Sequence, residues 1–171
     1  MRNNRRVAAA CAVAVAALAG MAVFAAKAFS RPGTTGQLPF ATTQAVADAR
    51  FAQFREARVA VGGRCLRVLV AATEALREEG LREVRDPAPY DGMIFVFPRD
   101  TRTEFTMAQT PTPLDITWYA ADGSPVDGTR MTPCPNGTDA TCPVYESKRR
   151  YRYALERTAG SASPGALGAC A

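Results

Sequence analysis

Residues 54–71, FREARVAVGGRCLRVLVA, contain two short runs in which apolar side chains recur at every second position. Such alternation is typical of a β-strand that buries one face. Between the runs, Gly62 and Gly63 can adopt the positive φ that a two-residue hairpin turn requires. We therefore predict a β-hairpin, whose alternating apolar residues are Val59, Val61, Leu66, Val68 and Val70.

The segments that follow the hairpin predict one short helix and several further strands. Thr73 is a suitable N-cap for a helix over residues 73–79, Ala75 and Leu76 are expected to face the core, and Gly80 ends the helix. Further strands are expected at residues 93–98, 103–109, 114–126 (with a turn at Asp122 and Gly123) and 144–156. This order predicts a mainly β domain with one short helix, either a β-sandwich or a partly closed barrel.

The N-terminus has the charge and hydropathy pattern of an export segment. Arg2, Arg5 and Arg6 precede an uncharged run over residues 7–26, and small residues flank Lys27 at a suitable cleavage position. The run is also long enough to span a bilayer, so a cleaved signal peptide and a retained membrane anchor both remain open. We predict an extracytoplasmic protein, secreted or anchored to the plasma membrane. Its parts are the export segment (1–28), a linker (29–53), a β domain (54–157) and a C-terminal tail (158–171).

The composition excludes several classes of chemistry. The 171 residues include no histidine, which excludes Ser–His–Asp and Cys–His catalysis and histidine-ligated metal sites. The formal charge of +5 falls close to zero outside residues 1–28, which contain four basic and no acidic residues. A nucleic-acid-binding domain would carry positive charge in its folded part. We therefore predict no nucleic-acid partner, no metal and no cofactor, and the lack of a nucleophile motif favours a non-enzymatic role.

Five segments in one order resemble the domain of unknown function 192 family. They are RCLRVLVAATEALREEGL (64–81), DGMIFVFP (91–98), FTMAQTPTPLDITWYAADG (105–123), PCPNGTDATCPVY (133–145) and YALE (153–156). The resemblance covers residues 55–157 and implies a compact, mainly β, commonly exported domain, with no established reaction. The family usually continues into one more strand after the Leu-Glu pair, whereas a different sequence follows here, so that strand is in question.

The cysteine spacing predicts disulfides. Cys134 and Cys142 enclose a short loop, and export to an oxidising compartment favours their pairing. A metal site at this pair is disfavoured, because no histidine or further nearby cysteine completes it. Cys65 and Cys170 are then left over, and the sequence leaves open whether they pair; a bond between them would attach the C-terminal tail to the hairpin.

Two sets of residues are candidates for a functional site. Phe105, Met107, Thr110 and Asp115 could line a ligand pocket, although Phe105 and Met107 also fit as alternate core residues of a strand with Asp115 capping a turn. The leading hypothesis is therefore a binding or accessory module for an envelope ligand or protein. The alternative is a hydrolase of envelope glycans that uses a pair among the carboxylates Glu104, Asp115 and Glu146.

The predicted last strand is rich in basic residues. Lys148, Arg149, Arg150 and Arg152 alternate with tyrosines and could bind an anionic envelope polymer, phospholipid headgroups or an acidic protein. The alternative is an edge strand whose charge prevents aggregation.

We expect residues 1–45 to export a fused reporter that is active only outside the cytoplasm, because the N-terminus has the order of charged and apolar regions that export requires. Reporter activity in cells measures this. A reporter that is expressed at full length but stays inactive would contradict the prediction.

Overall fold

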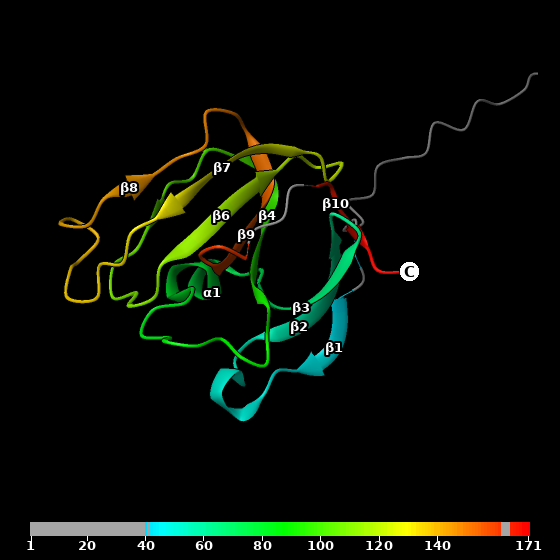
Figure 1. Ribbon diagram of the computed structural model, residues 1–171, viewed down its shortest axis with the longest axis horizontal. Helices are drawn as coiled ribbons and strands as arrows, with labels where there is room; N and C mark the ends of the chain where they lie inside the picture. Colours follow the sequence, from blue (N-terminus) through cyan, green and yellow to red (C-terminus); the bar gives the residue numbers. More distant parts are fainter. Residues whose placement is uncertain (1–39, 41, 162–164) are drawn as a thin grey trace, which may run out of the picture. The chain divides into compact units, whose positions relative to one another are not determined.

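The computed structural model of this chain describes Phe40, residues 42–161 and residues 165–171 (Figure 1). The expected export segment, residues 1–28, lies outside the described residues. Within the part of the chain that is described, no helix is long and apolar enough to cross a membrane.

The predicted hairpin forms the first part of the main sheet. Strand β2 (Arg55–Val61) pairs antiparallel with β3 (Arg64–Ala71) across the Gly62-Gly63 turn, so that Val61 lies opposite Arg64. Two short strands share the other side of β2. Strand β1 (Thr42–Val46) pairs with its beginning and β10 (Leu167–Ala169) with its end.

A crossover that contains the helix joins β3 to a parallel neighbour, β4 (Gly92–Thr101). The helix, α1 (Glu74–Glu79), begins where the Thr73 side chain accepts a hydrogen bond from the Leu76 amide, and it ends at Gly80. Gly80 has a φ of +52°, which glycine adopts at little cost. Leu76 is half-buried and packs on the core, but Ala75 is exposed, contrary to expectation, because so short a helix presents only a narrow face to the sheet.

The second half of the sheet is joined to the first through β9 (Tyr151–Thr158), which lies between β4 and β6 (Leu114–Tyr119). Strand β7 (Pro125–Met131) follows β6, giving the order β1-β2-β3-β4-β9-β6-β7. Strands β5 (Phe105–Thr106) and β8 (Val144–Tyr145) form a separate two-stranded sheet. The mainly β class with one short helix is confirmed, and the sheet is open, not a closed barrel.

Both faces of the central strands are buried. On one face, beneath α1, lies a cluster that includes Phe54, Leu69, Phe95 and Trp118. On the other face lies a second cluster that includes Val59, Ile94, Tyr153 and Leu167. The Leu167 amide donates to the Gly123 carbonyl in the β6–β7 turn, so β10 covers this second core while it extends the edge of β2.

Three segments differ from expectation. The described part of the expected linker, residues 29–53, contains β1 and a 3-10 turn, Ala49–Phe51, because Phe51 is buried in the first core. The expected tail, residues 158–171, contains β10, so a final strand exists in this chain despite its different sequence.

The third difference is the strand expected over residues 144–156, which is broken into β8 and β9. Between β8 and β9, side-chain oxygens accept hydrogen bonds from backbone amides that would otherwise pair with a neighbouring strand. The Lys148 amide donates to Asp127 at 2.8 Å, and the Arg149 amide donates to the buried Ser147 hydroxyl at 3.2 Å. Residues 146–150 therefore leave the sheet.

The structure contains two disulfides, one that the cysteine spacing predicts and one that the sequence left open. Cys134 bonds to Cys142, and Cys65 at the start of β3 bonds to Cys170 just after β10. Disulfides of this kind are typical of an oxidising compartment.

We expect the double variant Cys65→Ser/Cys170→Ser to lose about 5 kcal/mol of unfolding free energy, and Cys134→Ser/Cys142→Ser about half as much. The reason is that the first pair closes a sequence separation of 105 residues and the second a separation of 8. Urea unfolding of the oxidised full-length proteins measures both values. A larger loss from the short loop than from the long one would contradict the argument.

Candidate functional site

A cavity of about 770 Å³ opens on the face of the sheet that α1 covers. Its walls come from α1 and the loop after it, from β4, from the segment around β5, and from the loop closed by Cys134 and Cys142. The buried residues of its lining, which we call the floor, are Leu81, Phe95, Phe97, Phe105, Met107, Thr110 and Glu156.

The floor is mainly apolar and aromatic. Phe95 and Phe105 meet edge to face with ring centroids 5.1 Å apart, and Phe97 meets Tyr151 in the same way at 5.3 Å. Edge-to-face packing fixes ring orientations, so the floor is a preformed surface. The Thr110 hydroxyl adds a polar group and donates to the Ala108 carbonyl at 3.3 Å.

Glu156 is the buried acid of the floor. Its side chain is only 4% exposed, and in the sheet it lies between Met93 of β4 and Ile116 of β6, on the same face. The described part of the chain offers its carboxyl group no hydrogen-bond or ion-pair partner. Because burial penalises the charged form, the pKa of Glu156 is raised to about 8. At neutral pH this carboxyl group is therefore mostly protonated.

The backbone beside Glu156 is held by a close approach of two strands. Gly92, the first residue of β4, lies so near β9 that a Cβ atom there would stand 2.1 Å from the Glu156 carbonyl oxygen. Only glycine allows this approach, which explains the glycine in the segment DGMIFVFP (91–98).

The rim of the cavity is charged. Two arginines of the rim are held in place: the Arg77 guanidinium lies 4.9 Å from the Phe97 ring centroid and donates to the Val96 carbonyl, and Arg82 forms an ion pair of 2.7 Å with Asp139. Among the described lining residues outside the floor, acids outnumber bases, with Glu74, Glu78, Glu79, Asp100, Glu104 and Asp139 against Arg77, Arg82, Arg99 and Arg150.

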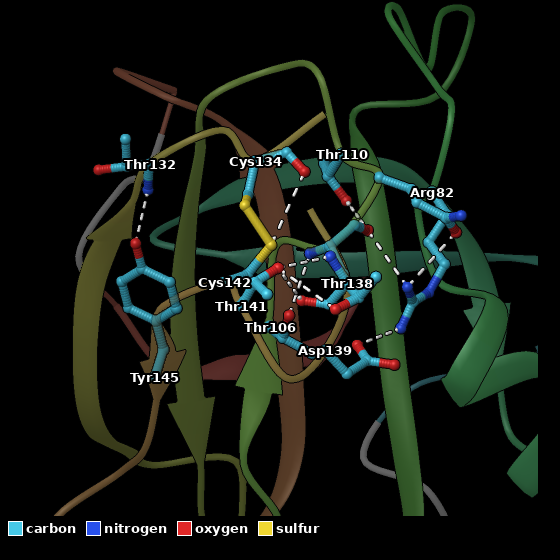
Figure 2. Close-up of a disulfide and its surroundings, with 12 residues drawn as sticks. Arg82, Thr106, Thr110, Thr132, Cys134, Thr138, Asp139, Thr141, Cys142 and Tyr145 are labelled. Atoms are coloured by element: carbon cyan, nitrogen blue, oxygen red, sulfur yellow. Dashed lines mark hydrogen bonds and ion pairs between the residues drawn. A yellow bond between two sulfur atoms is a disulfide. The ribbon is translucent and has the colours of Figure 1, made fainter. Parts of the chain in front are cut away.

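The loop closed by the Cys134–Cys142 disulfide forms one wall (Figure 2). Cys134 exchanges backbone hydrogen bonds with the segment that carries Thr110, since its amide donates to the Thr110 carbonyl and its carbonyl accepts from the Gln109 amide. Figure 2 shows Asp139 of the loop directed toward Arg82, the partner in its ion pair. The disulfide thus holds the loop against the floor.

Three of the four residues predicted to form a pocket lie together in the cavity lining: Phe105, Met107 and Thr110. Asp115 does not. It lies on β6, where it accepts from Arg130 at 2.9 Å and from the Gly160 amide at 2.6 Å. Phe105 and Met107 are also buried in the core. The interpretation as pocket residues and the interpretation as core residues therefore both apply to these two side chains.

The carboxylates proposed for hydrolysis are not gathered at the cavity. Of the three, only Glu104 belongs to the lining, while Glu146 lies in the exposed segment between β8 and β9. Within the described residues, no group of three cysteine, aspartate or glutamate side chains is arranged to hold a metal ion.

The four basic residues of the predicted last strand lie in different surroundings. Arg150 lines the cavity and donates to the Asp100 carbonyl, whereas Arg152 forms an ion pair with the Asp100 carboxylate at 2.8 Å. Lys148 and Arg149 are exposed in the segment before β9. The alternative of a protective edge strand is wrong, because β9 lies in the middle of the sheet between β4 and β6. Binding of an anionic surface by these residues stays a prediction.

Sequence reasoning missed Glu156 and Arg82 as site residues. The available signal for Glu156 was an acid directly after the apolar Ala154 and Leu155. That pattern does not separate a buried acid from one at a strand end, because the difference depends on the strands on either side.

We expect Glu156→Gln to remove a pH dependence of stability. The folded-state pKa of Glu156 lies above its unfolded value, so folding stability is fully present at low pH and falls as pH rises toward about 8. The glutamine variant keeps the hydrogen-bonding shape without this penalty. Relative to that of the parent, its unfolding free energy should rise by up to about 4 kcal/mol as the pH increases from 5 to 8. Chemical denaturation at several pH values measures the gain, with Glu146→Gln as an exposed control. Parallel pH profiles of parent and Glu156→Gln would refute the burial argument.

Comparisons with known proteins place this architecture in a family. A protein of unknown function from Novosphingobium aromaticivorans has a similar structure (TM-score 0.61, 22% identity), covering 74% of this chain and 91% of that one. A protein from Sinorhizobium meliloti described as a proposed transcription regulator is also similar (TM-score 0.54, 28% identity), covering 64% of this chain and 88% of that one. The comparison with curated proteins finds no match. Residues 57–168 match the family DUF192, described as "Uncharacterized ACR", and since they make up more than half of the sequence, the chain belongs to the DUF192 family.

Proposed function

We propose that this domain is a non-enzymatic binding module that holds a small amphipathic molecule in the cavity beneath α1. The observation that carries the proposal is a cavity of about 770 Å³ with a buried, preformed floor. Pockets for small molecules commonly enclose about 300–1,000 Å³, with apolar and aromatic walls and a few polar groups that fix orientation. The floor has this composition, with Thr110 and Glu156 as its polar groups.

The module is proposed to work outside the cytoplasm. Two disulfides support an oxidising compartment, and the charged-then-apolar N-terminus supports export. The protein would then be secreted, or held at the plasma membrane by its N-terminal segment, and its ligand would be an envelope or extracellular molecule.

A binding role is better supported than hydrolysis of a glycan. Two-carboxylate hydrolysis needs a pair of acids on either side of the bond to be cleaved, one of them ionised. Of the three acids proposed from the sequence, only Glu104 lies at the cavity. The acid of the floor, Glu156, lies between Met93 and Ile116 in the sheet and is mostly protonated at neutral pH.

We expect Thr106→Trp to abolish ligand binding, because Thr106 is a half-buried lining residue from which an indole would occupy the cavity. A fragment library that contains cationic, neutral and anionic members should give ligands of the parent by ligand-observed NMR. The matched control is Thr129→Trp, an exposed threonine of β7 outside the lining. Ligands that bind Thr106→Trp as well as the parent would overturn the cavity as their site, and the absence of any ligand would overturn the proposed function.

A further inference from the structure

We propose that Glu156 is the specificity-determining group of the cavity, and that it selects a ligand that carries a protonated amine on an apolar body. This inference rests on the proposed function and names the chemical class of its ligand. In the bound state the ammonium group pairs with the Glu156 carboxylate, while the apolar body lies on Leu81, Phe95, Phe105 and Met107.

The first argument is the position of an acid without a partner. Glu156 is 96% buried, lines the cavity and has Met93 and Ile116 as its neighbours across the sheet, which provide no hydrogen bonds from their side chains. A buried carboxyl group that lacks a partner destabilises the folded protein, because burial removes its hydration. A cationic ligand supplies the missing partner, so the cavity binds it in preference to a neutral or anionic ligand.

The second argument is the charge of the entrance. Among the described lining residues outside the floor, six are acidic and four are basic. Ion pairs engage Asp139 with Arg82 and Asp100 with Arg152, which leaves four acids and three arginines. A rim with excess negative charge attracts cations and disfavours anions. Arg77, whose guanidinium lies over the Phe97 ring, donates from Nη1 to the Val96 and Ala72 carbonyls, so this nitrogen is engaged within the protein.

Binding of an amine requires Glu156 to lose its proton. The carboxyl O–H bond breaks, the proton passes to water, and the remaining carboxylate pairs with the ammonium group that the ligand already carries. Because the pKa of Glu156 is raised to about 8, its carboxyl group is mostly protonated at pH 7 in the unliganded protein. Binding at pH 7 therefore releases nearly one proton per ligand.

Other charged groups of the lining modulate this titration. Those facing the cavity are Glu74, Arg77, Glu78 and Glu79 of α1, Arg82 of the following loop, and Arg99 and Asp100 of β4. The remaining elements contribute Glu104 before β5, Asp139 of the disulfide loop and Arg150 before β9. These groups lie in the exposed or half-buried part of the lining, where solvent screens them from Glu156.

The test compares three probes of nearly equal shape and different charge: tryptamine, tryptophol and indoleacetate. Isothermal titration calorimetry with the full-length oxidised protein at pH 7 should show tryptamine binding at least about tenfold more tightly than tryptophol, since a buried ion pair outweighs a neutral hydrogen bond. Titrations in buffers of different ionisation enthalpy should show release of close to one proton per tryptamine, and affinity should rise between pH 6 and pH 8.

Glu156→Gln should lower tryptamine affinity at least about tenfold and abolish proton release, while tryptophol affinity stays within about threefold of the parent. The matched control is Glu146→Gln, an exposed acid outside the cavity lining, which should change tryptamine affinity by no more than about threefold. A single cooperative melting transition of Glu156→Gln in the tryptophol complex, at or above the melting temperature of the parent, shows that the variant is folded.

The outcomes separate the two proposals. Tighter binding of tryptophol or indoleacetate than of tryptamine, blocked by Thr106→Trp, would overturn amine selection and leave the cavity as a binding site. Tryptamine binding without proton release, or undiminished in Glu156→Gln, would overturn the role of Glu156. Lack of binding by all three probes and by the fragment library would overturn both proposals.

Discussion

The pairing of β4 with β9 is the interaction on which the rest of this structure depends. Strand β4 continues the hairpin half of the sheet through its parallel contact with β3, and β9 continues into β6 and β7. Among the described strands, this pairing alone joins the halves into one sheet, and the continuous sheet provides two faces for two cores. Gly92 allows the close approach of the strands, since a Cβ atom there would stand 2.1 Å from the Glu156 carbonyl oxygen.

The same pairing buries two residues of opposite charge on β9. Glu156 and Arg157 are neighbours in sequence, but successive side chains of a strand point to opposite faces, so their charges do not pair with each other. Both are buried, at 4% and 6% exposure. Burial raises the pKa of Glu156 and lowers the pKa of Arg157, whose Nε and Nη1 atoms have no hydrogen-bond partner in the described structure. Of the two, Glu156 lines the cavity.

The cavity depends on segments that lie far apart in the sequence. Its floor combines β4, β9 and the Phe105–Thr110 region, and its wall is a loop that the Cys134–Cys142 disulfide closes against that region (Figure 2). The Arg82–Asp139 ion pair connects this wall to the loop after α1. The short disulfide therefore has a local effect on the site, whereas Cys65–Cys170 fastens β10 to the hairpin at the other side of the sheet (Figure 1).

The sequence by itself determined the elements whose signals are local: the hairpin around Gly62 and Gly63, the helix between Thr73 and Gly80, the Cys134–Cys142 pair and membership of the family. Alternation, capping and turn residues act over a few positions, so these elements could be predicted. Only the tertiary structure decided that residues 146–150 leave the sheet, because Asp127 of another strand binds the Lys148 amide. It likewise decided that Asp115 lies apart from Phe105, Met107 and Thr110, and that Glu156 is buried at the cavity floor. The burial of a charge depends on which strands flank it, and that pairing is a long-range property of the chain.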